Sequence, residues 1–308
     1  MNGEELVKNA AKQETSTEFY SPIPKGYEKG KTKFLIVAGS VMSGIGKGIF
    51  SSSLAMLLKY YGLKIQPIKF DGYLNLDAGT LNPYRHGEVF VLEDGLECDM
   101  DMGSYERFLD QNVNKNNYMT AGMVFDTILK RERNGEYLGR DVQFIPHVTG
   151  EIKFRLRNLA LKTQPDIVVL EVGGTVGDIE NSYLIEAIRE LIHEEGKENV
   201  CFVNLVYIIE PPNLGEQKSK AAQMGLNKLM SLGIQTDIVV CRAVNPVEER
   251  IKDKISVYSN VPVENVLSLH NARSVFEAPL VLKEQNTDKI VVKLLGLQDK
   301  VDEKKQLQ

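Results

Sequence analysis

The sequence is poor in cysteine and contains no long apolar run. Its only cysteines, Cys98, Cys201 and Cys241, lie far apart and show no paired metal-binding spacing. Because free cysteines without a disulfide framework suit a reducing compartment, we expect a cytoplasmic protein. No apolar segment approaches the ~18 residues of a membrane span, and the polar N-terminus shows no signal peptide. The sequence therefore predicts no membrane partner.

An excess of positive charge is also missing. The formal net charge is −5, which argues against a general nucleic-acid-binding protein. The chain has 308 residues, of which 43% are hydrophobic and 26% charged, as in a soluble globular protein with one large α/β domain or two small ones. We expect a flexible arm over 1–31, a domain over 32–297 and a charged tail or linker over 298–308.

Apolar, strand-like segments alternate with helix-like segments from residue 33 onward. The predicted strands are 33–38, 64–70, 166–172, 201–208, 237–241 and 265–269. The predicted helices are 50–61, 104–111, 119–132, 149–162, 181–195, 215–232 and 246–258. This alternation predicts a doubly wound α/β fold, with a mostly parallel sheet covered on both faces. Ligands of such sheets bind at the carboxyl ends of the strands.

A glycine-rich stretch, Gly39–Gly48, separates the first predicted strand from a helix. Strand, glycine loop and helix together are typical of a phosphate-binding loop, with Lys47 supplying a mobile charge. An ordinary glycine turn is the alternative. Gly48 stands where the strict P-loop pattern has a Ser or Thr that helps to hold magnesium. Ser51, Ser52 or carboxylates elsewhere could take that role.

Acidic residues and lysines follow several of the predicted strands. Glu97, Asp99 and Asp101 alternate with apolar residues, so an extended segment would place three carboxylates on one face. Mg²⁺ suits such a set, although a solvated acidic edge strand would have the same pattern. Lys69 and Glu171 each end an apolar strand, where an unpaired charge is costly.

Two further segments carry polar groups that suit a second ligand. Asp178 and Glu180 precede a helix, where they could bind a sugar or base or could simply cap the helix. Lys218 and Lys220 form a positive cluster near a helix start, which would suit an anionic ligand or a solvated surface.

Six ordered motifs resemble the amidoligase (synthetase) domain of the CTP synthase family, from about residue 32 to about residue 297. They are the glycine-rich loop, Lys69–Asp77, His86–Val91, Tyr105–Phe108, Gln143–His147 and Glu171–Glu180. The resemblance implies a P-loop-type α/β fold like that of dethiobiotin synthetase. It also implies that ATP phosphorylates O4 of UTP and that ammonia then displaces the phosphate, so that CTP, ADP and phosphate form.

The same resemblance implies roles for individual residues. The implied catalytic residues are Lys47, Lys69, Asp101 and Glu171, and the two carboxylates would hold Mg²⁺. The implied ATP-binding residues are Gly44, Ile45, Gly46, Lys47, Gly48, Ile49, Asp101, Arg242, His270, Asn271 and Ala272. Those for UTP or CTP are Ser43, Gln143, Asp178, Ile179, Glu180, Lys218, Ser219, Lys220, Gln223 and Lys254. Ammonia would pass His86 and Val89, and the family's homotetramer is implied too.

The chain also departs from the family pattern. Gly44 stands where the family usually has Ser, and Met123 where it has a basic residue. Further departures are Ala221-Ala222 in the lysine motif and His270–Ala272 in the adenine-side loop. No nucleophile-elbow motif surrounds any cysteine, so we expect free ammonia or a separate glutaminase as the nitrogen source, unless the chain is part of a longer enzyme.

Two other functions fit parts of the sequence. One is a related ATP-dependent amidoligase that acts on another carbonyl-bearing nucleotide or heterocycle in a specialised pathway. The other is a nucleotide-dependent switch that dimerises around ATP. The acidic segment 97–101 and the lysine motif 218–223 argue against the switch, because a switch needs no second site for an anionic nucleotide.

Overall fold

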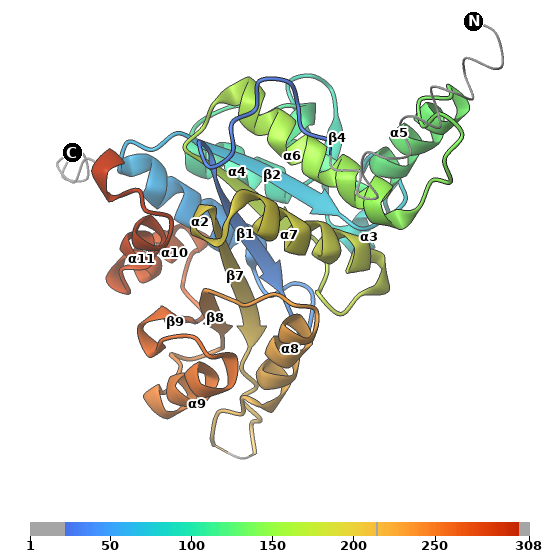
Figure 1. Cartoon of the computed structure of the whole chain (residues 1–308). Coiled ribbons are helices and arrows are strands. Elements are labelled where there is room, and N and C mark those ends of the chain that lie inside the picture. The colour runs from blue at the N-terminus through green and yellow to red at the C-terminus, as the bar shows by residue number, and fades with distance from the viewer. Residues whose placement is uncertain (1–21, 214, 302–308) are drawn as a thin grey trace, which may run out of the picture.

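Seven parallel strands form the centre of the protein in this computed structural model, which describes residues 22–213 and 215–301 (Figure 1). Across the sheet they lie in the order β5 (Tyr118–Thr120), β2 (Ile65–Asp71), β6 (Ile167–Val172), β1 (Lys33–Gly39), β7 (Val200–Tyr207), β8 (Ile238–Arg242) and β9 (Val266–Leu269). The predicted doubly wound, mostly parallel fold is confirmed. Each of the six predicted strands differs from the observed one by at most one residue at either end.

Helices cover both faces of the sheet. One face carries α2 (Lys47–Tyr60), α4 (Asp101–Leu109), α10 (Ala278–Glu284) and α11 (Thr287–Leu294). The other face carries α5 (Ala121–Arg133), α6 (Thr149–Thr163), α7 (Ser182–Glu195), α8 (Lys220–Ser231) and α9 (Glu249–Ser259). Outside the sheet lie α3 (Pro83–His86), the hairpin of β3 (Val89–Val91) and β4 (Glu97–Asp99), and a π-helical turn, Phe144–Val148.

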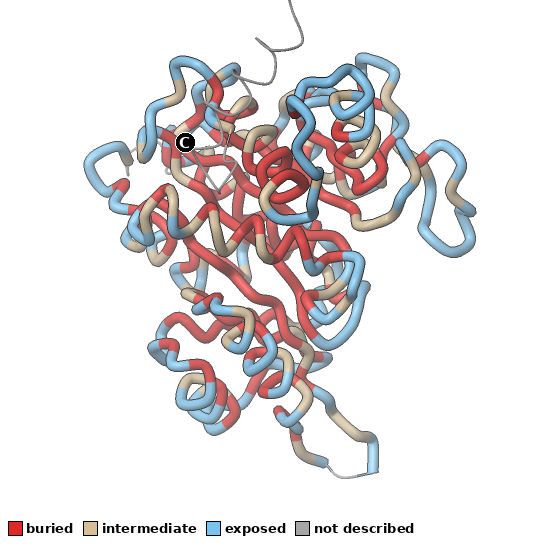
Figure 2. The backbone as a smooth tube through the Cα atoms, turned by 45° about the vertical axis from the view of Figure 1, so that its right-hand side comes forward, coloured by how far each residue is buried: buried red, intermediate tan, exposed pale blue. Residues whose placement is uncertain are grey.

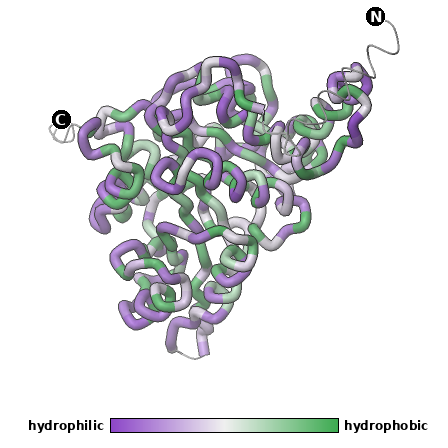
Figure 3. The backbone as a smooth tube through the Cα atoms, viewed as in Figure 1, coloured by the Kyte–Doolittle hydropathy of each residue, from purple (hydrophilic) through white to green (hydrophobic). Residues whose placement is uncertain are grey.

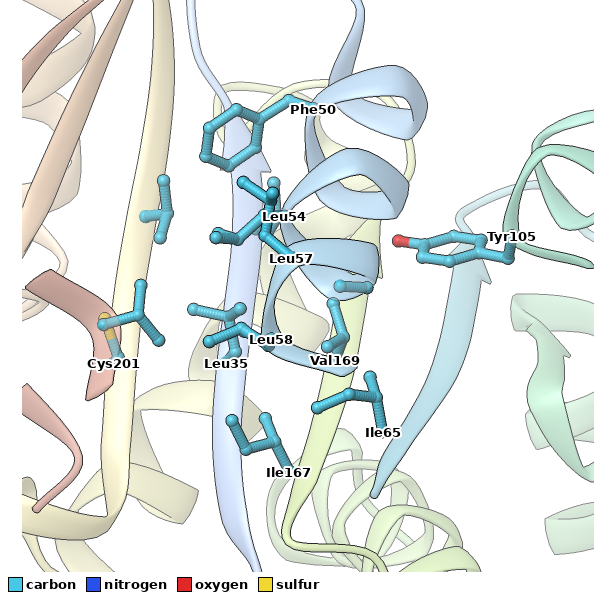
Figure 4. Close-up of a cluster of buried hydrophobic side chains, with 14 of the residues drawn as sticks. Leu35, Phe50, Leu54, Leu57, Leu58, Ile65, Tyr105, Ile167, Val169 and Cys201 are labelled. Atoms are coloured by element: carbon cyan, nitrogen blue, oxygen red, sulfur yellow. The ribbon is translucent and has the colours of Figure 1, made fainter. Parts of the chain in front are cut away.

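Successive side chains of each central strand point to opposite faces of the sheet. Since helices cover both faces, almost every residue of these strands is buried. Along β1, Leu35 and Val37 pack beneath α2, whereas Phe34 and Ile36 pack beneath α6 and α7. The strands are accordingly buried along their length and hydrophobic (Figures 2 and 3). Figure 4 shows leucines of α2 lying over this core.

Element boundaries depart from the predictions where short-range contacts decide them. The helix α8 begins at Lys220 and not at residue 215, because the backbone of Lys218 pairs with that of Ile209. The segment predicted as a helix from residue 119 begins instead within the short strand β5. The helices α10 and α11 were not predicted, because segments of 7 and 8 residues are too short to show a clear period.

Most of the predicted arm and tail lie outside the described residues, which begin at 22 and end at 301. Within the described part, the hydroxyl of Tyr27 donates to Glu195, and the guanidinium of Arg157 lies 5.8 Å from the Tyr27 ring centroid. All three cysteines are buried and free. In the described ranges no helix is long and apolar enough to cross a bilayer.

Candidate active site

The predicted phosphate loop follows β1 and leads into α2. Gly44 and Gly46 have φ angles of 73° and 85°, a region that favours glycine, and they turn the chain into the first turn of α2. The backbone N–H groups at this helix start suit an anion. Ile45 lies buried between the two glycines and anchors the loop in the core, whereas Ser43 is exposed.

Lys47 lies at the first position of α2, beneath the loop. Its ammonium group donates to the carbonyl oxygen of Gly174 at 2.7 Å, which ties the phosphate loop to the loop that follows β6. Burial lowers the pKa of Lys47, although Glu171 opposes the shift. A buried lysine with one neutral partner is suited to receive an anionic ligand.

Gly48, which stands where the strict P-loop pattern has a Ser or Thr, lies against the carboxylate of Asp101. A Cβ at residue 48 would be 2.6 Å from the carboxylate carbon of Asp101, so no side chain fits unless Asp101 moves. The absent side chain therefore makes room for an acidic group from α4. Asp101 occupies space that the Ser or Thr of the strict P-loop pattern would need.

Glu97, Asp99 and Asp101 were predicted to share one face of an extended segment, and this prediction is wrong for Asp101. The strand β4 ends at Asp99, whose Oδ1 accepts the backbone N–H of Asp101 at 2.9 Å. This local turn ends the strand, and Asp101 opens the helix α4. Glu97 is exposed, and its carboxylate lies beside Gly79. Only Asp99 and Asp101 of the three reach Lys69.

Lys69 lies among four carboxylates. Its Nζ is 3.0 Å from Asp99 Oδ1, 3.8 Å from Asp71 Oδ1 and 3.9 Å from Glu171 Oε1, and it also pairs with Asp101. Burial alone would lower the pKa of Lys69, but the carboxylates outweigh burial and hold this pKa well above its usual value. The parallel register of β2 and β6 sets Lys69 beside Glu171. The structure thus brings three of the predicted catalytic residues together.

Glu171 is a buried carboxylate at the end of β6. Ser51 of α2 donates to its Oε2 at 3.2 Å, and the hydroxyl of Tyr105 donates to Ser51 at 2.6 Å. Figure 4 shows the Tyr105 hydroxyl pointing toward α2. Burial, and then the charge of Asp101, raises the pKa of Glu171 to about 8. Both effects favour the protonated form of this carboxyl group.

The raised pKa of Glu171 has a consequence for stability in metal-free buffer. Between its unfolded pKa and about 8, the folded state binds the extra proton, so its stability falls as pH rises through this window. The variant Glu171→Gln is expected to melt near the wild-type temperature at pH 5 and several degrees higher at pH 9, at roughly 2–4 °C per kcal/mol. Thermal melts with a chelator measure this, and equal wild-type and variant curves at pH 9 would contradict it.

A divalent metal fits the charge of this cluster. In residues 22–213 and 215–301, no group of three or more His, Cys, Asp or Glu side chains is arranged to hold a metal ion. Lys69 instead lies where the four carboxylates converge. One ammonium group among four carboxylates leaves these acids with surplus negative charge. Carboxylate oxygens are ligands that Mg²⁺ prefers.

Hydrogen bonds among its own polar residues fix the conformation of the loop after β6. Asp178 accepts hydrogen bonds from the backbone N–H of Thr175 at 2.6 Å and from its hydroxyl at 2.9 Å. Asn181 donates to the carbonyl oxygens of Gly173 and Thr175. Ile179 and Glu180 are exposed at the tip of this loop. The structure therefore gives Asp178 a role in shaping the loop, whereas its neighbours face outward.

The other residues predicted to bind a pyrimidine nucleotide lie on several elements. The side chain of Gln143 is exposed and contacts Asp141. At the start of α8, Gln223 donates to the hydroxyl of Ser219 at 3.0 Å, and both are buried. Lys218, Lys220 and Lys254 are exposed, Lys218 beside Glu216 and Lys254 on α9.

The residues predicted for the adenine side and the ammonia path lie at opposite edges of the sheet. At the ends of β8 and β9, Arg242 bonds to the side chain of Asn271, next to His270 and the exposed Ala272. Beyond β2, His86 is exposed on α3, and Val89 pairs in register with Asp99. Figure 1 shows these groups of elements on either side of β1.

Two residues of the site were not predicted as functional. Asp71 ends β2, and Tyr118 of β5 donates to its carboxylate at 2.8 Å. One feature of the sequence could have indicated Asp71. It follows Lys69 by two residues and therefore lies on the same face of the strand. The pairing of β2 with β5, which brings Tyr118 to this position, has no local sequence signal.

A parallel sheet, a phosphate loop and a buried cluster of acids and lysines define a nucleotide-binding α/β domain of the P-loop type. A family model described as the CTP synthase N-terminus matches residues 33–297. The chain therefore belongs to the CTP synthase N-terminus family.

Similar proteins include the CTP synthase of Pyrococcus abyssi, 50% identical over 87% of this chain and 50% of the relative. The CTP synthase of Caldanaerobacter subterraneus is 46% identical over 86% of this chain and 49% of the relative. The chain spans about half the length of these curated relatives. Among solved structures, the signal recognition particle 54 kDa protein of Aeropyrum pernix K1 with GDP has a TM-score of 0.42 and 10% identity, and covers 96% of this chain and 59% of that chain.

Proposed function

We propose that this chain aminates UTP to CTP with ATP and ammonia. The observation that carries the proposal is the convergence of Lys47, Lys69 and the buried carboxylates beneath a phosphate loop, in a chain of this family. Phosphoryl transfer depends mainly on positioning and on stabilising charge, and this site is built from charged groups on rigid strands and helices.

The phosphate loop and its lysines would handle ATP. The backbone from Gly44 to Ile49 and the ammonium group of Lys47 would hold the phosphates of ATP. Lys69, which lies in the carboxylate cluster, would reach the phosphoryl group during its transfer to O4 of the pyrimidine. Arg242 and the segment His270–Ala272 would contact the adenine side.

Asp101 and Glu171 would hold Mg²⁺, with Asp101 packed against Gly48 at the start of α2. When bound, the metal would neutralise phosphate oxygens during the transfer. The protein's own part is to keep these two carboxylates close to the loop, through Ser51 on one side and Lys69 on the other.

A second anionic nucleotide would bind beside this centre. Ser43, Gln143 and the segment Asp178–Glu180 would contact the pyrimidine. The triphosphate would meet a polar cluster at the start of α8 and on α9, namely Lys218, Ser219, Lys220, Gln223 and Lys254.

Ammonia would approach past His86 and Val89. A homotetramer would complete the triphosphate site across a subunit interface, and the nitrogen would come from free ammonia or from a glutaminase.

One assay tests the proposal against its rivals. The protein is incubated with ATP, Mg²⁺ and ammonium chloride, and UTP, UDP, UMP or uridine is added in turn, while ADP and the amino product are followed. CTP formed from UTP alone supports the proposal. Turnover only with another carbonyl compound would assign the chain to a related amidoligase. ATP hydrolysis without amination would indicate a nucleotide switch.

Lys220→Ala is expected to weaken the binding of the triphosphate-bearing substrate more than that of ATP. A charged hydrogen bond contributes about 1.5–3 kcal/mol, so the KM for UTP should rise roughly 10-fold or more, while the KM for ATP changes little. Lys228→Ala, at the exposed last turn of the same helix, is the matched control. An unchanged KM for UTP in the Lys220 variant would end this assignment.

A further inference from the structure

Asp71 is a buried carboxylate that the proposed roles leave unused. Its side chain ends β2, on the same face of the strand as Lys69, and the residue is 6% exposed. Two tyrosine hydroxyls donate to its Oδ2, Tyr118 at 2.8 Å and Tyr73 at 3.2 Å. Its Oδ1 lies 3.8 Å from the ammonium group of Lys69. A buried acid with such partners is held in one orientation.

Asp71 lies between the proposed ammonia path and the phosphoryl-transfer centre. On one side, Tyr73 packs its ring edge-on against His86, with ring centroids 6.4 Å apart. The hydroxyls of Tyr73 and Tyr118 are also in contact, so the chain of contacts from His86 to Asp71 is continuous. On the other side lie Lys69 and its cluster.

The third side of Asp71 faces the loop after β6. A Cβ at Gly173 would lie 2.7 Å from the carbonyl oxygen of Phe70 and still closer to Asp71 Oδ1. The glycine therefore keeps the space beside this oxygen clear at the start of the loop that would hold the pyrimidine. The carboxylate thus lies beside Lys69 and the start of the proposed pyrimidine loop, and it reaches the proposed ammonia path through Tyr73.

Amination of a phosphorylated pyrimidine needs a proton acceptor. When ammonia attacks C4, the new C–N bond leaves a positive charge on nitrogen, and one N–H proton must depart before the amine is neutral. We propose that Asp71 accepts this proton as the amine adds, so that the C4–O bond can then break and its electron pair leave with the phosphate. The inference rests on the proposed function, since it assigns a step of that reaction.

The surroundings of Asp71 suit a temporary proton acceptor. Burial raises the pKa of Asp71 above its usual range, although Lys69 opposes the shift. The tyrosine hydroxyls stabilise the ionised form by donating hydrogen bonds. The proton would pass on to solvent or to the departing phosphate after each turnover. Asp101, which packs against Gly48, and Glu171, which accepts from Ser51, instead lie toward the phosphate loop.

The test separates phosphorylation from amination in the variant Asp71→Asn. Rapid-quench experiments with ATP, Mg²⁺ and UTP measure the first ADP formed per site, and steady-state assays with ammonium chloride measure CTP. We expect the ADP burst to survive within a few fold, while CTP formation falls by roughly 100-fold or more, the size typical of general-base catalysis. Asp299→Asn, an exposed carboxylate outside the site, should leave both unchanged.

Replacing ammonia with a second amine tests the role of Asp71 as a proton acceptor directly. Hydroxylamine is a much weaker base than ammonia, so its adduct loses the proton to water more readily, and the deficit of Asp71→Asn should shrink at least about tenfold. Parallel loss of the ADP burst and of CTP would overturn the inference, because Asp71 would then only support Lys69 or the fold. Unchanged CTP formation, or an equal deficit with both amines, would overturn it too. A wild-type protein that forms no CTP would instead refute the proposed function.

Discussion

Asp101→Asn is expected to lower kcat for CTP formation by about 10³-fold or more while the protein stays folded. Asparagine keeps the size of the side chain but removes the charge that pairs with Lys69 and that would hold Mg²⁺. A charged group aimed at a reacting centre in a buried site is commonly responsible for a rate effect of 10²–10³ or more. Steady-state kinetics at saturating ATP and UTP, together with a thermal melt, measure both parts of the expectation.

Glu97→Gln is the matched control for this experiment. Glu97 and Asp101 both belong to the acidic segment 97–101, and the sequence pattern does not distinguish their roles. In the structure, Glu97 is exposed and does not reach Lys69. Its variant should keep activity within a few fold. Near-normal activity of Asp101→Asn, or an equal loss in both variants, would refute the role of Asp101 as the acid of the phosphoryl-transfer centre.

Gly48→Ser is expected to lower the activity strongly, although it brings the loop closer to the strict P-loop pattern. A Cβ at this position would lie 2.6 Å from the carboxylate carbon of Asp101, so either the helix start or the carboxylate must move. Overpacking of this kind costs about 1–3 kcal/mol, and the shift of Asp101 should lower kcat by about 100-fold. The measurement is kcat for ADP release in the presence of UTP and ammonia.

Gly44→Ser makes the same chemical change four residues earlier and serves as the control. No atom lies within 4 Å of a Cβ at Gly44, so the only cost is the left-handed backbone, with a φ of 73°. That strain is about 1–2 kcal/mol, and the variant should stay active within about tenfold. If Gly48→Ser were as active as this control, the close packing of Gly48 on Asp101 would not matter for catalysis.

Sequence patterns predicted six of the seven strands of the sheet and the edge of the sheet at which Lys69 and Glu171 lie. Apolar runs such as 33–38 and 166–172 are local signals, and parallel strands must end at the same edge. Lys69 and Glu171 near the ends of their strands, and Lys47 after the loop that follows β1, were therefore expected to lie near one another. Their actual contacts depend on register, which sets Lys69 beside Glu171 and which no single strand specifies.

The remaining features of the site arise from contacts between distant segments. The packing of Gly48 on Asp101 joins two helices, α2 and α4, and makes the absence of a side chain a requirement of the site. The pairing of Tyr118 with Asp71 depends on a strand of three residues, the last two of which were predicted to be helical. A turn at Asp99 decides where Asp101 points, although the alternating pattern suggested an extended segment.

Lys69 gives the resting site a built-in counter-ion. Its ammonium group lies among four carboxylates at the place where their charges converge. In the proposed reaction Asp101 and Glu171 would hold Mg²⁺, and its charge would weaken the hold of these two carboxylates on the ammonium group of Lys69. The lysine that balances these acids in the ligand-free protein would then be less tightly paired and better able to reach a phosphate.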